Sequence, residues 1–267
     1  MGLFKAAITK SALKKALKKQ CITVNNKLGT SATYITGGET IVLSITNDDS
    51  NQKKLILNLE VLFEDDHLAV IQKPAGLLVS GNTFKTVTNA LGRNLKKCQR
   101  PDATKAQPVH RLDFETTGVL LIGKTSSSIR HLNKLFEHKT IKKTYHAITI
   151  GSMITQGSIT VAIDDKPSLS NYKLIDSVTS KRFGTLNLLE LEPQTGRHHQ
   201  LRKHLAHIGH PILGDKVYGK APLILKGKGL YLHASTLEFI HPFTHKKMRI
   251  ESELPKRFKK IFKPKAC

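Results

Sequence analysis

Asp113 is the acidic residue whose sequence neighbours most strongly suggest chemistry. It lies in the stretch VHRLDFETTGVLLIGKT, residues 109–125, after a His-Arg pair and before a Thr-Thr-Gly turn. The turn leads into an apolar run, so we expect the acid to lie on a loop in front of a rigid strand. A carboxylate held in this way could act as a nucleophile or as a base.

Two other interpretations of Asp113 involve its charged neighbours. Beside Arg111 it could form an ion pair that only stabilises the fold, and by itself the local sequence leaves this open. With Glu115 it could form the carboxylate pair of a glycosidase. Glycosidases normally take the two carboxylates from separate elements, however, and the chain has no tryptophan to stack on a sugar. The glycosidase interpretation is therefore disfavoured.

The second half of the same stretch matches the phosphate-loop pattern G-x-x-x-x-G-K-[ST], from Gly118 to Thr125. Such a loop needs a flexible backbone whose N–H groups converge on phosphate oxygens. Here the four variable positions, 119–122, are Val, Leu, Leu and Ile, which favour a buried strand. We therefore expect a strand at this position and no nucleotide cofactor.

The histidine-rich stretch HHQLRKHLAHIGH, residues 198–210, invites a metal-site interpretation. Its histidines have neither H-E-x-x-H spacing nor a nearby cysteine pair. Leu201, Leu205 and Ile208 instead recur at helical spacing and predict an apolar helix face. We therefore expect no metal ion.

The overall charge indicates a polyanionic partner. Among 267 residues, 43 are Lys or Arg and 20 are Asp or Glu, which gives a formal net charge of +23. A hydrophobic content of 39% excludes a simple disordered basic tail. Basic residues are densest in the first 38 residues and between residues 246 and 265. Because phosphate neutralisation supplies most non-specific affinity for nucleic acid, RNA or DNA is the favoured partner.

Other features of the composition restrict the compartment. No apolar run approaches the roughly 20 residues that span a bilayer, so we expect no membrane association. Cys21, Cys98 and Cys267 fit no disulfide framework, and the first twenty residues lack the apolar run of a secretory signal. We expect a cytoplasmic monomer.

The N-terminal segment predicts a small basic domain. Ser11 is a plausible N-cap for a helix with an apolar face, and two short strands follow in ITVNNKLGT and TYITGGETIVLSI. Over residues 3–46 this pattern resembles the RNA-binding domain named after ribosomal small-subunit protein four. The alternative is a basic helix packed on a hairpin with no ligand. The resemblance implies that the lysines on the polar helix face bind RNA: Lys14, Lys15, Lys18 and Lys19.

The remainder of the chain predicts a second, larger domain. The polar stretch 46–54 indicates a connection, and we place the domains at residues 1–50 and 58–267 with a linker at 51–57. Beyond it, many apolar strands alternate with turns, and helices are expected near residues 126–138 and 197–208. This pattern is typical of an α+β domain with a mixed, mostly antiparallel sheet.

Several segments of the larger domain together resemble the RluA-type family of pseudouridine synthases over residues 58–260. In order, these are VLFEDDHLAVIQKPAGLLV, HRLDFETTGVLLIGKT, KKTYHAITIG, TGRHHQLRKHLAHIGHPILGDKVYG and YLHASTLEFIHPFT. The resemblance implies an RNA isomerase without a cofactor, which breaks the N1 glycosidic bond of a uridine and rejoins the uracil through C5. We expect the substrate to be ribosomal RNA, with transfer RNA as the alternative.

The resemblance also implies roles for individual residues. Asp113 matches the catalytic aspartate, which either attacks the ribose at C1′ or removes a C2′ proton; the sequence does not choose between these routes. Tyr145 is expected to stack on the target uracil or to take the C5 proton, and Leu201 to pack beside the base. Arg202 is expected to pair with the carboxylate. Arg111 is expected to fill the space that the extruded nucleotide leaves.

The chain departs from the pattern of this family at a few positions. They are Phe114 and Thr117 in the turn after the aspartate, His198, and the Ser80-Gly81 pair after the first motif. None of them replaces the aspartate, the tyrosine or the arginine, so they bear on the choice of substrate.

Overall fold

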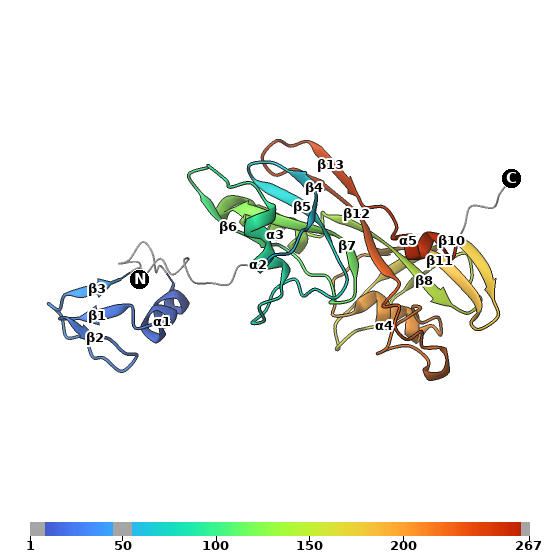
Figure 1. Cartoon of the computed structure of the whole chain (residues 1–267), viewed down its shortest axis with the longest axis horizontal. Coiled ribbons are helices and arrows are strands. Elements are labelled where there is room, and N and C mark those ends of the chain that lie inside the picture. Colours follow the sequence, from blue (N-terminus) through green and yellow to red (C-terminus); the bar gives the residue numbers. More distant parts are fainter. Residues whose placement is uncertain (1–8, 45–54, 263–267) are drawn as a thin grey trace. The chain divides into compact units, whose positions relative to one another are not determined.

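The computed structural model describes residues 9–44 and 55–262, which belong to two compact units (Figure 1). The units comprise residues 1–53 and 54–267. Within the described residues, no helix is long and apolar enough to cross a membrane.

Several sequence predictions lie wholly or partly outside the described residues. They are the two ends of the RNA-binding resemblance, 3–8 and 45–46, the whole polar stretch 46–54, the first four residues of the linker predicted at 51–57, the end of the basic tail, 263–265, and Cys267. The last part of that linker belongs with the larger unit, because Leu55 and Leu57 pack against its core.

The smaller unit combines one helix with a three-stranded antiparallel sheet. Its elements are α1 (Lys10–Lys18), β1 (Ile22–Val24), β2 (Lys27–Leu28) and β3 (Ile41–Leu43), with strand order β2-β1-β3. Asn25 and Asn26 have φ values of 48° and 64° and make the tight turn between β1 and β2. Asparagine tolerates this left-handed conformation better than most residues do.

Helix α1 begins earlier than the sequence analysis predicted. Thr9, and not Ser11, is the N-cap: its backbone is extended, and its hydroxyl accepts a hydrogen bond from the N–H of Ala12 at 3.1 Å. Ser11 lies inside the helix. The register of the helix faces is unaffected, and the side chains of all four predicted lysines are exposed: Lys14, Lys15, Lys18 and Lys19.

The larger unit is built on a ten-stranded sheet with helices beside it (Figure 1). Its strands are β4 (Glu60–Glu64), β5 (Leu68–Lys73), β6 (Ala103–Pro108), β7 (Thr117–Thr125), β8 (Lys142–Ile150), β9 (Gln156–Ile159), β10 (Ser170–Ser180), β11 (Gly184–Pro193), β12 (Leu232–Ile240) and β13 (Lys247–Glu251). Its helices are α2 (Val87–Asn94), α3 (Ser126–Glu137), α4 (Gln200–His207), α5 (Lys256–Lys259) and the short 3-10 helix η2 (Ala221–Leu223).

The strand order confirms the expected mixed, mostly antiparallel sheet. The main path is β4-β5-β7-β12-β8-β11-β10-β9, with β6 paired to β7 and β13 paired to β12. The pairing of β7 with β12 is parallel and joins two residues of each strand, whereas the other described pairings between these strands are antiparallel.

Two hydrophobic clusters divide the larger unit into halves. The first is centred on β5, β7, α2 and α3, and the second on β8, β11 and α4. Tyr145 on β8 packs against both clusters, so it lies where the halves meet.

Strand β7 contains the GVLLIGKT sequence and confirms the prediction of a buried strand. Residues 119–122 are fully buried, and β7 pairs with β5 along most of its length. The Lys124 ammonium is buried in an ion pair with Glu64 at 2.6 Å, and the Thr125 side chain caps α3. The lysine and threonine of the phosphate-loop pattern are thus both engaged in structural contacts.

Gly118 permits the parallel contact between β7 and β12. Its φ is +119°, and it pairs with Ala234 of β12. A Cβ atom at this position would overlap the backbone carbonyl of Ala234. Residue 118 must therefore be glycine for the two halves to join as they do.

Replacing Gly118 with alanine should therefore destabilise the larger unit by about 3 kcal/mol or more, through backbone overlap and an unfavourable φ. Urea-induced unfolding, followed by fluorescence or circular dichroism, measures this loss. Gly92→Ala is the matched control, because a Cβ there meets no atom within 4 Å and Gly92 lies within α2. We expect the control to be neutral or slightly stabilising. Equal stability of the two variants would contradict the role assigned to Gly118.

Candidate active site

A cavity of about 720 Å³ lies where the two halves of the larger unit meet. One wall is the loop between β6 and β7, and another is the segment that leads into α4. Tyr145 and Lys143 of β8 also line it, together with Leu232 of β12. Its walls combine apolar side chains with a few charged ones, as in most small-molecule and nucleotide sites.

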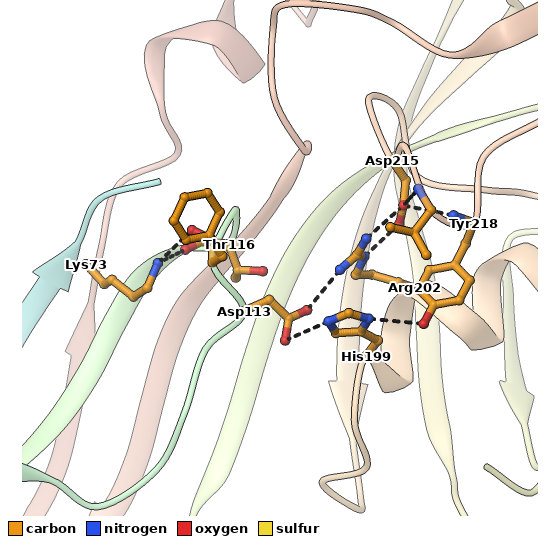
Figure 2. Close-up of polar contacts among 9 residues, drawn as sticks. Lys73, Asp113, Thr116, His199, Arg202, Asp215 and Tyr218 are labelled. Carbon is orange, nitrogen blue, oxygen red and sulfur yellow. Dashed lines mark hydrogen bonds and ion pairs between the residues drawn. The ribbon is translucent and has the colours of Figure 1, made fainter. Parts of the chain in front are cut away.

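The loop that carries Asp113 is held by a buried lysine (Figure 2). Lys73 at the end of β5 is fully buried, and its ammonium donates hydrogen bonds to the carbonyls of Phe114 at 3.2 Å and Thr116 at 2.8 Å. Burial lowers the pKa of Lys73 to about 8, and the charge of Asp113 acts in the opposite direction. These bonds fix the backbone immediately after the carboxylate.

His110 fixes the loop from its other side. Its Nε2 accepts a hydrogen bond from the N–H of Leu121 in β7 at 3.0 Å, and its ring packs on Phe136. Desolvation, and then the charge of Lys143, lowers the pKa of His110 to about 3. The ring is therefore neutral at physiological pH, and its role is to orient the loop.

Asp113 faces the guanidinium of Arg202, which is already bound to a second carboxylate (Figure 2). The Arg202 Nε and Nη2 donate to Asp215 at 2.7 and 2.9 Å, while Nη1 lies 3.6 Å from Asp113 Oδ2. Asp215 also accepts from the backbone N–H groups of Val217 and Tyr218. Burial works against the charged form of Arg202, but its bonds to Asp215 outweigh this and raise its pKa.

His199 approaches the other oxygen of the same carboxylate. Its Nε2 lies 3.8 Å from Asp113 Oδ1, and its Nδ1 shares a hydrogen bond of 3.0 Å with the Tyr218 hydroxyl. Burial lowers the pKa of His199 although Asp113 opposes the shift. His199 also has a φ of 54°, a strained conformation for a residue with a side chain. Such strain is typical of residues that a site holds in a required orientation.

Gln200 maintains the loop that presents His199. Its Oε1 accepts from the Thr195 hydroxyl at 2.7 Å and from the backbone N–H of Arg197 at 3.0 Å. Its amide nitrogen donates to the Leu169 carbonyl at 2.9 Å. This buried amide thereby ties the start of α4 to the segment before β10.

Tyr145 presents a neutral phenol to the cavity. Desolvation, and then the negative charge of Asp113, raises its pKa, so the hydroxyl keeps its proton at physiological pH. A protonated phenol is a poor proton acceptor but an effective stacking surface. Of the two roles expected from the sequence, this environment favours stacking.

The five residues predicted for the active site lie around this one cavity. Asp113 and Arg111 come from the β6–β7 loop, Tyr145 from β8, and Leu201 and Arg202 from α4. Leu201 is buried, whereas Arg111 is exposed. The lysines predicted to bind RNA belong to the smaller unit: Lys14, Lys15, Lys18 and Lys19.

Sequence reasoning assigned no role to four residues that shape the site: Lys73, His199, Asp215 and Tyr218. The signal was present, because they lie within the KPAG, RHHQ and GDKVYG segments of the motifs given above. Their contacts join segments that are far apart along the chain, so the local pattern does not indicate them.

The histidine-rich stretch has structural contacts. His204 is buried in α4, and its ring nitrogens approach Ser170 Oγ at 3.0 Å and the Val161 carbonyl at 3.0 Å. With both nitrogens engaged in this way, His204 has none left for a metal ion.

Comparisons with known proteins identify relatives that span this site. A family model described as RNA pseudouridylate synthase matches residues 67–207. The ribosomal large subunit pseudouridine synthase D of Nitrosomonas europaea is 32% identical, over 92% of this chain and 77% of that protein. The ribosomal large subunit pseudouridine synthase C of Rickettsia bellii is 31% identical, over 95% and 92% of the two chains.

A solved structure supports the same relationship. The human protein RNA pseudouridylate synthase domain containing 4 superposes with a TM-score of 0.62 and 27% identity. The similarity covers 74% of this chain and 90% of the human one.

Asp215→Asn should destabilise the fold by about 3–5 kcal/mol, because it removes the hydrogen-bonded counter-charge of the buried Arg202 and leaves only Asp113, whose oxygen is 3.6 Å away. Chemical denaturation measures this loss. Asp164→Asn is the control: Asp164 pairs with Lys203, also on α4, but its side chain is 67% exposed. That pair should contribute less than about 1 kcal/mol. A similarly small loss of stability in both variants would show that Asp215 is not required to balance the buried positive charge of Arg202.

Proposed function

The chain belongs to the RNA pseudouridylate synthase family and is an RNA pseudouridine synthase, and we propose that Asp113 is the catalytic residue with which it isomerises uridines of ribosomal RNA. One observation carries this assignment. The Asp113 carboxylate lies in the cavity wall with the Arg202 guanidinium 3.6 Å away. A positive charge at this distance attracts the carboxylate and helps to hold it in the cavity wall, where a bound nucleotide would meet it.

The reaction needs one carboxylate beside the ribose. The bond between N1 and C1′ of the uridine breaks, a bond between C5 and C1′ forms, C5 loses a proton and N1 gains one. Asp113 either attacks C1′ or removes the C2′ proton, and both routes require its oxygens at the sugar edge of the bound nucleotide. The bonds from Lys73 fix the loop so that the carboxylate does not have to be reordered when RNA binds.

The other walls of the cavity suit a uracil base. Tyr145 offers a neutral aromatic ring for stacking, and Leu201 is an apolar neighbour at the start of α4. A stacked uridine is inaccessible in a helix, so it must be extruded into the cavity at a cost of a few kcal/mol. We propose that Arg111, which is exposed at the cavity wall, occupies the space left behind.

Ribosomal RNA is the proposed substrate because the relatives from Nitrosomonas europaea and Rickettsia bellii are named as synthases of the ribosomal large subunit. The net charge of +23 supports a large polyanionic substrate. We propose that the enzyme works as a monomer in the cytoplasm.

Asp113→Asn should reduce pseudouridine formation by at least about 10²–10⁴-fold, because the amide can act neither as a base nor as a nucleophile. Tritium release from C5-labelled uridine in separate ribosomal and transfer RNA pools measures the reaction. Mapping of pseudouridines in a deletion strain, with and without each allele, identifies the modified uridine.

Two results of these experiments would contradict the proposal. Tritium release by Asp113→Asn at the wild-type rate would remove this residue from catalysis. Restoration of the cellular role by Asp113→Asn, without any modification, would favour a non-catalytic RNA-binding protein. Tritium release from transfer RNA alone would leave the role of Asp113 standing, but it would show that transfer RNA and not ribosomal RNA is the substrate.

We further propose that the smaller unit binds RNA through its exposed lysines. Replacing Lys14, Lys15, Lys18 and Lys19 with glutamate should weaken binding to long RNA and make it less salt-dependent. The plot of log K against log salt has a negative slope. The magnitude of this slope should decrease by about 0.7–0.9 for each phosphate that the variant no longer neutralises. A quadruple arginine variant keeps the charge and should bind like the wild type. Equal loss of turnover on a short stem-loop would contradict a separable RNA-binding role.

A further inference from the structure

Phe114, the residue after Asp113, exposes an aromatic ring on the turn that carries the carboxylate. Its exposed fraction is 51%, although a phenylalanine is usually buried. One side of the ring is near Gly76, where a Cβ atom would lie 4.0 Å from the ring Cζ. The ring therefore has backbone on one side while about half of the residue is accessible to solvent.

The backbone of Phe114 is fixed by its neighbours. Its carbonyl accepts hydrogen bonds from the N–H of Gly76 at 2.8 Å and from the ammonium of Lys73 at 3.2 Å. A third bond, from the N–H of Thr116 to the carbonyl of Asp113 at 3.1 Å, closes the turn. Asp113 and Thr116 at the ends of this turn line the cavity, and Phe114 lies between them in the chain but outside the cavity lining.

We propose that the ring of Phe114 stacks on the base of a nucleotide next to the target uridine. This inference rests on the proposed function and extends it to a contact outside the reaction cavity. When the uridine is extruded, the neighbouring base loses the uridine as its stacking partner. This neighbouring base itself stays outside the cavity. An aromatic ring whose position is already fixed replaces that partner with little loss of conformational entropy.

The charges around the cavity favour RNA as the group that covers this ring. Arg111 and Lys139 are exposed at the cavity wall, and Lys143 and Arg197 are half-buried there, whereas Glu137 is the exposed acid among the lining residues. This excess of positive charge complements a phosphate backbone, whereas an apolar protein segment would leave the charges unpaired.

Steady-state kinetics of Phe114 variants test this proposal. The substrate is a transcript of about 30 nucleotides centred on the uridine mapped in the deletion strain. Phe114→Ala should raise KM about 5- to 100-fold, the effect of losing one stacked base, with a much smaller change in kcat. Phe114→Tyr keeps the aromatic ring and should therefore have the same KM as the wild type. Phe114→Leu keeps apolar contact with Gly76 but lacks the π-face, and should behave like Phe114→Ala.

Ile240→Ala is the control for loss of exposed apolar surface. Ile240 is also 51% exposed, but it lies eight residues along β12 from the cavity residue Leu232, about 26 Å at the usual rise of a strand. We expect its KM to match that of the wild type.

Abasic nucleotides placed in turn at the two flanking positions identify the stacked base. At one position the abasic substitution should raise the wild-type KM as much as Phe114→Ala does, and combining the two changes should add nothing further. Additive effects at both positions, rescue by Phe114→Leu, or a fall in kcat without a change in KM would overturn the proposal. Absence of pseudouridine formation by the wild type on every RNA would instead overturn the proposed function, which is a separate outcome.

Discussion

The buried pair of Arg202 and Asp215 is the interaction on which the rest of the active site depends. An arginine side chain of which 4% is exposed would be costly without a counter-charge, and Asp215 supplies one through two hydrogen bonds. Because Asp215 occupies Nε and Nη2, the third nitrogen is left to face Asp113. The structural pair therefore provides the carboxylate of Asp113, the proposed catalytic residue, with a positive charge that is already in place in the structure.

The same principle applies to the opposite wall of the cavity. Lys73 and His110 both form hydrogen bonds with the backbone. One donates to carbonyls as an ammonium, and the other accepts an N–H as a neutral ring. Polar groups buried in this way are expensive unless they are paired, so their pairing makes the loop conformation specific. The site thus rests on a set of satisfied polar groups that do no chemistry themselves.

Periodicity and motif order were sufficient to predict many of the secondary-structure elements of this molecule. The apolar run 119–122 predicted the buried strand, and the helical spacing of Leu201 and Leu205 predicted α4. The family resemblance implied one distant pair, Asp113 with Arg202, but the sequence did not show which other distant groups would meet. Lys73 and Thr116 are 43 residues apart, and only the antiparallel pairing of β5 with β7 brings them together. The error at the start of α1 has a local cause: Thr9 and Ser11 both carry a hydroxyl that can cap a helix.

The short parallel pairing of β7 with β12 has a mechanical consequence. Two residues of each strand form this seam, and Gly118 within it lies five residues after Asp113. Asp113 belongs to the half on one side, and Arg202 belongs to the half on the other. Any tilt of one half against the other therefore changes the separation between the carboxylate and its counter-charge. An RNA that contacted both halves would therefore act on the distance between Asp113 and Arg202, and so on the electrostatic field at the two carboxylate oxygens.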